Sequence, residues 1–420
     1  MNVPRVRVAH GLRPMSGRDP EESHRPATTL ELLYDLTFVI GFGTAASELA
    51  HALAAGHVRP AVLAFTISVF AIVWAWMNET WFASAYDTDD WLYRLLTMAQ
   101  MIGVLVMALG IPRLFASLQN GQVVDNTVMV LGYVVMRVPL VFQWLRAAKS
   151  DPARRPLCLV FAKALVIAQI GWVVLAVLQL SLVPSLIMTA ALAIVELTAP
   201  AIASIKYGGL PWHPHHLAER YGLLVIIALG EGLIGTMATL TTIFGESGWS
   251  VDFIVLGLAG VGLTFSLWWS YFTFPSGKLL AAHRNAVRVW SYGHIPIFGS
   301  IVAIGAGLHA AAYFLQGHSH LSASTTVLTV AVPVAGYVGL IYGVYYWLKR
   351  QLDAFHNLLL LLSGLLIVAG YVLARTTGGL TVPLLVVAAV PWVTVLGYEL
   401  IGHRRVQARS GVTPTSVGPS

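Results

Sequence analysis

Ionisable side chains occur inside long apolar stretches of this sequence, where each needs a partner or a polar cavity. Glu31 and Asp35 are four residues apart in one stretch, so a helix would place them on the same face. Glu231 lies in the middle of another stretch, between Gly230 and Gly232. A charge at bilayer depth is costly unless it faces a cavity or a counter-charge. These three carboxyls are therefore candidate sites for a proton or a cation.

Arg137 is a candidate counter-ion or anion clamp. It sits in mid-stretch, two residues before Pro139. Because arginine does not lose its proton in proteins, it must find an anion. Its depth points to Glu231 as that anion, with Glu48 as the alternative. A structural ion pair and a clamp on a substrate both remain open.

Two further residues complete the candidate substrate or ion site. His294 precedes Pro296, which lacks the amide hydrogen that a helical hydrogen bond needs. A histidine beside such a defect can titrate near neutral pH, so His294 is a candidate proton relay, with a packing histidine as the alternative. Glu219 opens a later apolar stretch and is the other candidate.

Each embedded carboxyl also has a structural interpretation. The helix macrodipole stabilises a carboxylate in the first turn, which suits Glu31 better than the deeper Asp35. Polar groups also hold membrane helices together. The glycines beside Glu231 could let a second helix approach closely, or let the backbone loosen as in the broken helices of transporters.

A histidine-rich connection is a weak candidate for a transition-metal site. It reads Trp212-His213-Pro214-His215-His216. Metal sites of this kind usually add carboxylates or cysteines, and none accompanies these histidines. We therefore expect no metal and no cofactor. The single cysteine, Cys158, also excludes a disulfide or an iron–sulfur ligand set within one chain.

The composition requires that these residues sit in a membrane protein. Of 420 residues, 57% are hydrophobic and 10% are charged, against about 25% charged in a soluble protein. The main partner of such a chain is the lipid bilayer. The net charge of +6 would otherwise suggest nucleic acid, but the basic residues occupy short loops between apolar runs. We therefore expect no nucleic-acid binding.

The sequence predicts an all-α, polytopic transmembrane bundle of about twelve helices. A helix of about 20 apolar residues crosses the bilayer core. Runs of this length occur at 30–54, 60–84, 91–114, 124–147, 157–179, 182–203, 217–243, 250–274, 288–314, 324–347, 355–375 and 380–402.

Basic residues are distributed unequally between the two sides of this arrangement. Nineteen Lys and Arg residues lie on one side: in the N-terminal segment, in or at the helix ends beside alternate connections, and in the C-terminal tail. The opposite side holds Arg59, Arg113 and Arg375. Because basic loops stay in the cytoplasm, both termini are predicted to be cytoplasmic, which requires an even number of helices.

The two halves of the chain show signs of an internal duplication. Each half has an acidic motif at the start of its first helix and a pair of tryptophans in its second. We expect a parallel six-plus-six repeat. The expected parts are a basic cytoplasmic segment (1–29), a first half (30–203), a histidine-containing cytoplasmic linker (204–216), a second half (217–402) and a flexible cytoplasmic tail (403–420).

Two of these motifs carry a resemblance to a known family. Glu31-Leu-Leu-Tyr-Asp35-Leu-Thr-Phe-Val39 resembles the opening signature of the bacterial low temperature requirement protein A (LtrA) family. Glu219-Arg-Tyr-Gly222, followed by Ile226-Ile-Ala-Leu-Gly-Glu231, resembles its central signature. The segment around His294-Ile-Pro296 is also similar, and the resemblance covers roughly residues 25–405.

The resemblance implies a multi-pass protein of the bacterial inner membrane, and it marks Glu31, Asp35, Glu219 and Glu231 as family positions. Tyr34 stands where the family pattern has another aromatic such as Phe. Gly232 stands where Ser is common, which puts a hydroxyl role at that position in doubt. The family name reflects growth in the cold, so the resemblance implies no substrate.

A secondary transporter or permease is the function that the sequence favours. Its embedded carboxylates would couple transport of an unknown small molecule or ion to a proton or cation. No nucleotide-binding loop of the Walker type occurs. The alternatives are a membrane-embedded enzyme acting on a lipid or isoprenoid-like substrate and a non-catalytic sensor or assembly factor. The sequence indicates neither a substrate nor an oligomeric state.

Overall fold

The computed structural model describes residues 11–22, 25–121, 123–349 and 354–402. The predicted flexible tail, 403–420, and the first ten residues of the predicted basic segment lie outside this part. Within it the chain is all-helical, and twelve helical stretches are long and apolar enough to cross a membrane. The predicted fold class is confirmed.

The helices follow the predicted runs closely. They are α1 (Thr29–Ala54), α2 (Val58–Tyr86), α3 (Trp91–Asn120), α4 (Thr127–Ser150), α5 (Arg155–Leu178), α6 (Leu182–Tyr207), α7 (Pro214–Ser247), α8 (Val251–Phe272), α9 (Ser276–Ala282), α10 (Val287–Leu315), α11 (Ala323–Lys349), α12 (Ala354–Thr377), α13 (Thr381–Ala388) and α14 (Val390–Gly397). A 3-10 turn, η1 (Arg284–Ala286), precedes α10, and a π-helical turn, η2 (Tyr398–Gly402), follows α14.

Two local features differ from the predicted runs. The short helix α9 occupies a connection for which the sequence predicted no helix. The last predicted helix, 380–402, is divided into α13, α14 and η2. Pro391 stands at the start of α14, and its ring nitrogen cannot donate the hydrogen bond that would continue α13.

Packing contacts divide the chain into two compact units. The first contains α1 up to Ala52, α2 to α6, the start of α7 up to Ile227, and α9. The second contains α7 from Ala228 onward, α8 and nearly all of the chain from α10 to the end. The predicted duplication stays a prediction.

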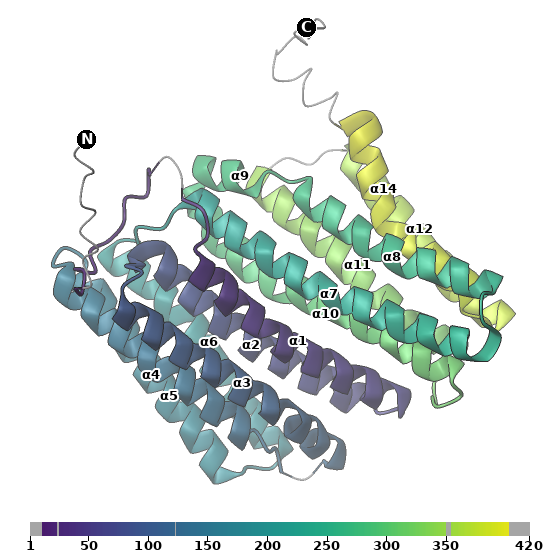
Figure 1. Ribbon diagram of the computed structural model, residues 1–420, viewed down its shortest axis with the longest axis horizontal. Coiled ribbons are helices and arrows are strands. Elements are labelled where there is room, and N and C mark those ends of the chain that lie inside the picture. The colour runs from purple at the N-terminus through teal and green to yellow at the C-terminus, as the bar shows by residue number, and fades with distance from the viewer. Residues whose placement is uncertain (1–10, 23–24, 122, 350–353, 403–420) are drawn as a thin grey trace, which may run out of the picture. The chain divides into compact units, whose positions relative to one another are not determined.

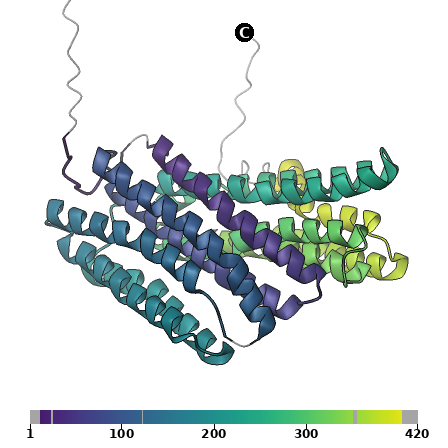
Figure 2. The ribbon, with the colours of Figure 1, turned by 60° about the horizontal axis from the view of Figure 1, so that its bottom comes forward.

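In the first unit, α3, α4, α5 and α6 lie side by side in chain order (Figures 1 and 2). Glycines let α3 and α4 approach so closely that their backbones touch. A Cβ on Gly132 would lie 2.3 Å from the backbone nitrogen of Met107, and one on Gly103 would lie 2.7 Å from the carbonyl oxygen of Gly132. Small residues at helix crossings are the usual means of tight packing in lipid.

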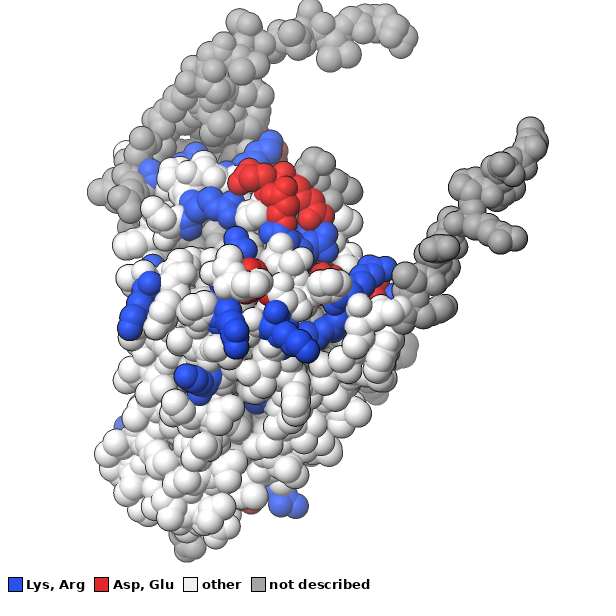
Figure 3. Space-filling view, turned by 90° about the vertical axis from the view of Figure 1, so that its left-hand side faces the viewer, with Lys and Arg blue, Asp and Glu red and all other residues white. Residues whose placement is uncertain are grey.

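The surface is as apolar as a lipid environment requires. Val177, Ile205 and Leu109 each expose more than 70% of their surface. In the face that Figure 3 presents, Lys and Arg side chains gather toward one end, and most of the remaining surface carries no charge. A water-facing protein would not expose so many large apolar side chains together.

We expect Gly132→Ala to weaken the first unit. The added methyl would overlap the α3 backbone, and overpacking of this kind costs about 1–3 kcal/mol. Reversible unfolding in mixed micelles measures the loss. Gly364→Ala is the matched control, because a Cβ on this α12 glycine meets nothing within 4 Å. Equal stability of the two variants would contradict the close contact.

Candidate functional site

A buried arginine on α7 gathers the acidic residues of two other helices. Arg220 donates from Nε to Asp35 Oδ2 (3.0 Å) and from Nη2 to Asp35 Oδ1 (2.6 Å). Its Nη1 lies 2.9 Å from Glu31 Oε1, and its Nη2 lies 3.3 Å from Glu79 Oε2. One guanidinium therefore contacts three carboxyls, and the pair with Asp35 is bidentate, the strongest geometry available to these groups.

His216 completes this group, which we call the Arg220 cluster: Arg220, His216, Glu31, Asp35 and Glu79. The Nε2 atom of His216 lies 3.0 Å from Glu31 Oε1. Every member of the cluster has at most 1% of its surface exposed. The sequence had offered His216 as a weak metal ligand, whereas the structure uses it as a partner of a carboxyl.

Local helix geometry explains how the cluster is assembled. Glu31 and Asp35 lie one turn apart on α1, and His216 and Arg220 lie one turn apart on α7, so each pair shares a face. Glu31 also completes a capping box. Its carboxylate accepts from the amide of Thr28 (2.7 Å), and its own amide donates to the Thr28 hydroxyl (3.2 Å).

Aromatic residues orient the remaining carboxyls. The indole Nε1 of Trp76 donates to Asp35 Oδ1 at 2.6 Å, and the Arg220 guanidinium lies over the same indole at 5.9 Å. The hydroxyl of Tyr93 donates to Glu79 Oε1 at 3.4 Å. Glu79 thus makes the two longest contacts in the group, and Asp35 makes the shortest.

The cluster does not balance its own charge. If all three carboxyls were ionised, they would exceed Arg220 by two negative charges, or by one with a protonated His216. An excess charge enclosed away from water is strongly unfavourable. The buried Arg25 lies near Glu31 but donates to backbone carbonyls and to no carboxyl of the cluster. A proton on one carboxyl would relieve the excess, and Glu79, with the weakest contacts, is the best candidate.

The part of the N-terminal segment that the structure describes covers the ends of neighbouring helices. Arg25 is buried and donates to the carbonyl oxygens of Ser84 and Ala83, at the end of α2. His213 caps α7, because its Nδ1 accepts from the amide of His216, and its Nε2 donates to the carbonyl of Glu22. This segment therefore ties the end of α2 to the start of α7.

Arg137 has a different partner from the one predicted. Its Nη2 donates to the hydroxyl of Tyr133, and that hydroxyl lies 2.9 Å from both carboxylate oxygens of Glu196. Arg137 Nη2 itself lies 3.9 Å from Glu196 Oε1. The prediction of Glu231 was wrong because it matched depth alone, and depth does not decide which helix of a bundle is the neighbour.

The contacts of this triad are those of a structural link between helices. Most of α6 faces outward, and Glu196 is its one buried charged residue among those described. The Arg137–Tyr133–Glu196 contacts link α6 to α4 through long side chains, which agrees with the structural interpretation of Arg137.

Glu231 is buried in the second unit, with 5% of its surface exposed. The helix α7 continues unbroken through it, so the loosened backbone considered from the sequence is absent here. Of the two flanking glycines, Gly232 lies against α8, where a Cβ would be 2.7 Å from the hydroxyl of Thr264, whereas a Cβ on Gly230 would meet nothing within 4 Å. The close approach at Glu231 itself comes from a glycine of α10. A Cβ on Gly305 of α10 would lie 2.6 Å from the backbone of Glu231.

His294 is a well-satisfied packing residue. Its Nδ1 donates to the carbonyl of Trp290 at 2.7 Å, and its Nε2 accepts from the hydroxyl of Tyr271 at 2.9 Å. Both ring nitrogens are thus engaged as a neutral imidazole engages them. The geometry favours the packing interpretation over the proton relay.

Glu219 does not join the cluster. It is exposed, and in the described part of the chain it forms no ion pair. Its neighbour Arg220 faces inward instead, since adjacent residues on a helix point about 100° apart. His215 is exposed as well, and the described residues include no group of three or more His, Cys, Asp or Glu side chains placed to hold a metal.

Arg220→Gln should destabilise the protein by about 3–5 kcal/mol, because three buried carboxyls would lose their common cation. Adding Asp35→Asn removes one of those charges and should restore roughly half of the loss. Reversible unfolding in mixed micelles measures both values, with Glu219→Gln as the exposed neighbouring control. A double variant no more stable than Arg220→Gln would show that charge balance is not what holds the cluster together.

Asp87, in the α2–α3 connection, predicts a pH dependence. Burial, with a smaller contribution from the Glu31 carboxylate, raises the pKa of Asp87 from 3.8 to about 6. Because the ionised form is disfavoured only in the folded state, stability falls as the pH rises from about 4 to about 6.

Asp87→Asn should therefore stabilise the protein at about pH 7.5, by up to about 3 kcal/mol, and have little effect near pH 4. The amide keeps the oxygen that accepts from the Asp89 backbone. Unfolding measured across this pH range tests the difference, and an equal effect at both ends would contradict it.

Comparison with known proteins agrees with this architecture. Residues 26–391 match the family model described as bacterial low temperature requirement A protein (LtrA). An uncharacterised protein of Rhizobium meliloti (strain 1021) is 27% identical over 298 residues, which cover 66% of this chain and 67% of that protein. No solved structure matches. The family match spans most of the chain and includes the whole Arg220 cluster, so this polytopic membrane protein belongs to the LtrA family.

Proposed function

We propose that this protein is a secondary transporter of the bacterial inner membrane, and that proton uptake at the Arg220 cluster couples to movement of a small molecule or ion. The observation that carries the proposal is the charge excess of the cluster. Three carboxyls share one guanidinium in an enclosed site, so the number of protons bound there changes its net charge. Embedded ionisable groups of this kind are typical of proton pathways in transporters.

The contacts support a division of roles within the cluster. Asp35 holds Arg220 through two short hydrogen bonds and accepts a third from Trp76, so it is the firmest partner of the guanidinium. Among the described residues, Glu79 has only the two long contacts, to Arg220 and Tyr93, and it is the proposed proton carrier. When Glu79 holds a proton, the Arg220 guanidinium pairs with the carboxylates of Asp35 and Glu31 alone. Loss of that proton draws the guanidinium toward α2.

The cluster joins three helices whose relative movement the proposed transport would require. Its carboxyls lie on α1 and α2, and its cation lies on α7, so a change in charge alters the attraction between these helices. The N-terminal segment contacts the ends of the same helices, through Arg25 on α2 and Glu22 on His213. We propose that this closed arrangement opens when the charge of the cluster changes. The charge bias of the loops supports cytoplasmic termini and hence a cytoplasmic position for this end.

Untargeted metabolite profiling, inside and outside cells, tests the transporter and names its substrate. A strain lacking the protein is compared with one that overproduces it. A single unchanged mass that shifts between the two compartments supports transport. A new mass that appears as its precursor falls would mean chemistry and would replace this proposal with the enzyme alternative.

Glu79→Gln tests the coupling site once that mass is known. The variant should accumulate in the membrane, because the glutamine oxygen can still accept from Arg220 and its NH2 group can donate to the hydroxyl of Tyr93. In reconstituted vesicles, uptake driven by a pH gradient should fall at least about tenfold, while Glu219→Gln should leave uptake unchanged. Uptake by Glu79→Gln that keeps the full pH-gradient dependence would exclude the cluster as the coupling site.

A further inference from the structure

The second unit contains an embedded carboxyl that the Arg220 cluster does not involve. Glu231 lies midway along α7, with 5% of its surface exposed. Within the described residues, its carboxyl forms neither a hydrogen bond nor an ion pair. A buried carboxylate without a partner is among the least favourable groups in a protein interior.

The missing side chain of Gly305 creates the room for Glu231. A Cβ built on Gly305 would lie 2.8 Å from the Cβ of Glu231, so the glutamate leaves α7 facing α10. One turn further along α7, a Cβ on Gly235 would lie 2.4 Å from the carbonyl oxygen of Gly305. The two helices therefore cross at these glycines, and the carboxyl sits at their crossing.

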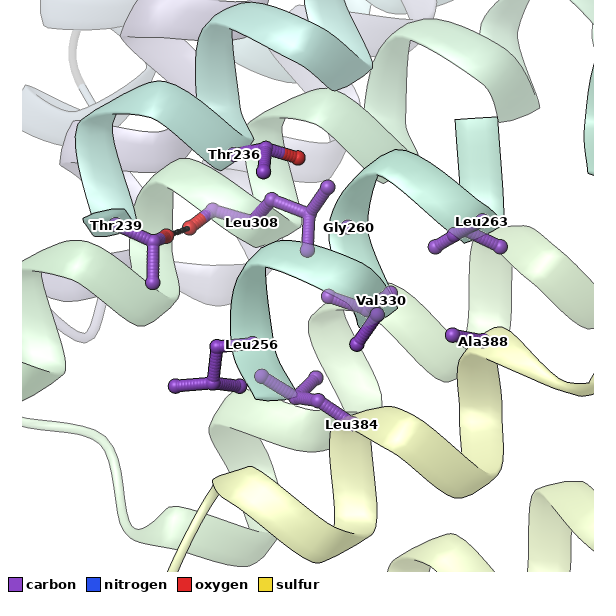
Figure 4. A pocket seen from close by; sticks show the side chains of 10 residues that line it. Thr236, Thr239, Leu256, Gly260, Leu263, Leu308, Val330, Leu384 and Ala388 are labelled. Carbon is purple, nitrogen blue, oxygen red and sulfur yellow. Dashed lines mark hydrogen bonds between the residues drawn. The ribbon is translucent and has the colours of Figure 1, made fainter. Parts of the chain in front are cut away.

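The space near this crossing is too small for a hydrated metal cation, and the threonine hydroxyls there point their hydrogens at helix carbonyls. The hydroxyl of Thr236 donates to the carbonyl of Gly232, and that of Thr239 donates to the carbonyl of Leu308 at 2.8 Å. Figure 4 shows the contact of Thr239 with Leu308 among the side chains that line a cavity. The cavity has a volume of about 10 Å³, hardly room for one water. A calcium or magnesium site would need six or more oxygen ligands, waters included.

Few titratable groups lie on the elements packed against Glu231. On α10, His309 follows Gly305 by one turn, and its ring stacks on Tyr313. His294, earlier on α10, is engaged with Tyr271 of α8. The α8 residue that faces the same turn of α7 is Thr264, opposite Gly232, and it does not titrate. No cation among these groups compensates Glu231.

We propose that Glu231, at the α7–α10 crossing over Gly305, is a proton-binding site of the second unit. The carboxyl is a neutral acid while the two helices are packed, and it ionises when water reaches the crossing. This site is separate from the Arg220 cluster and does not require that cluster to be the coupling site.

Labelling with dicyclohexylcarbodiimide tests the proposal on the intact protein in lipid vesicles. This apolar reagent adds the O–H of a carboxylic acid across its C=N bond and does not react with a carboxylate. Peptide mass spectrometry should locate the adduct on Glu231. Its rate of formation should be at least about tenfold higher near pH 6 than near pH 9.

Three controls make the result decisive. A water-soluble carbodiimide should label the exposed Glu219 and leave Glu231 unmodified. Glu231→Gln should abolish the adduct at that position, and Glu79→Gln should leave it unchanged, which separates this site from the proposed coupling site. Addition of Na⁺ or K⁺ at constant pH should not slow the labelling.

Two outcomes would overturn the proposal. Absence of the adduct at every pH would mean that Glu231 does not hold a proton in the membrane. Suppression of labelling by Na⁺ or K⁺ would mean that the site binds a metal cation instead of a proton. Neither outcome bears on the Glu79 experiment, which measures uptake and not labelling.

Discussion

The enclosure of one guanidinium by three carboxyls constrains how α1, α2 and α7 pack in the first unit. Arg220 cannot lose its charge, and it has no access to water, so α1 and α2 must present acids to α7 where they surround this residue. The same contacts leave an excess of negative charge, which only a proton or a cation can relieve. The same contacts of Arg220 thus explain both how these helices pack and why proton uptake is proposed there.

Two kinds of polar contact hold the helices together, and they differ in what they can do. The Arg137–Tyr133–Glu196 triad joins one cation to one anion through a shared hydroxyl, so it has little reason to change its protonation. The Arg220 cluster is unbalanced, and Glu231 has no partner among the described residues. Imbalance, more than depth in the membrane, distinguishes a group that exchanges protons from one that fastens helices.

Glycine has a corresponding role in packing. At Gly103 and Gly132 the absent side chains bring α3 and α4 into backbone contact. At Gly305 the absent side chain leaves the position that Glu231 occupies. In lipid, where burial of apolar surface does not drive helices together, such close approach supplies much of the attraction between them.

Hydropathy and charge were sufficient to predict the helices, because a bilayer imposes a minimum length and excludes charge whatever the neighbours are. Local spacing was also sufficient to place Glu31 and Asp35 on one face. Local spacing could not decide whether Glu219 or Arg220 faces the interior. Adjacent residues of a helix face different ways, and only the packed neighbours show which way is inward. One sequence signal could have identified Arg220 and His216 as site residues: they are one helical turn apart at the start of an apolar run.

The sequence by itself determined an all-α membrane protein, its twelve spans and several members of its charged site, since these depend on local composition. Only the tertiary structure decided the partners: Arg220 with Glu31, Asp35 and Glu79, Arg137 with Glu196, and Glu231 with none among the described residues. The reason is physical. Which helices become neighbours depends on the side chains and glycines of both surfaces together, and a pattern within one helix carries no information about the other.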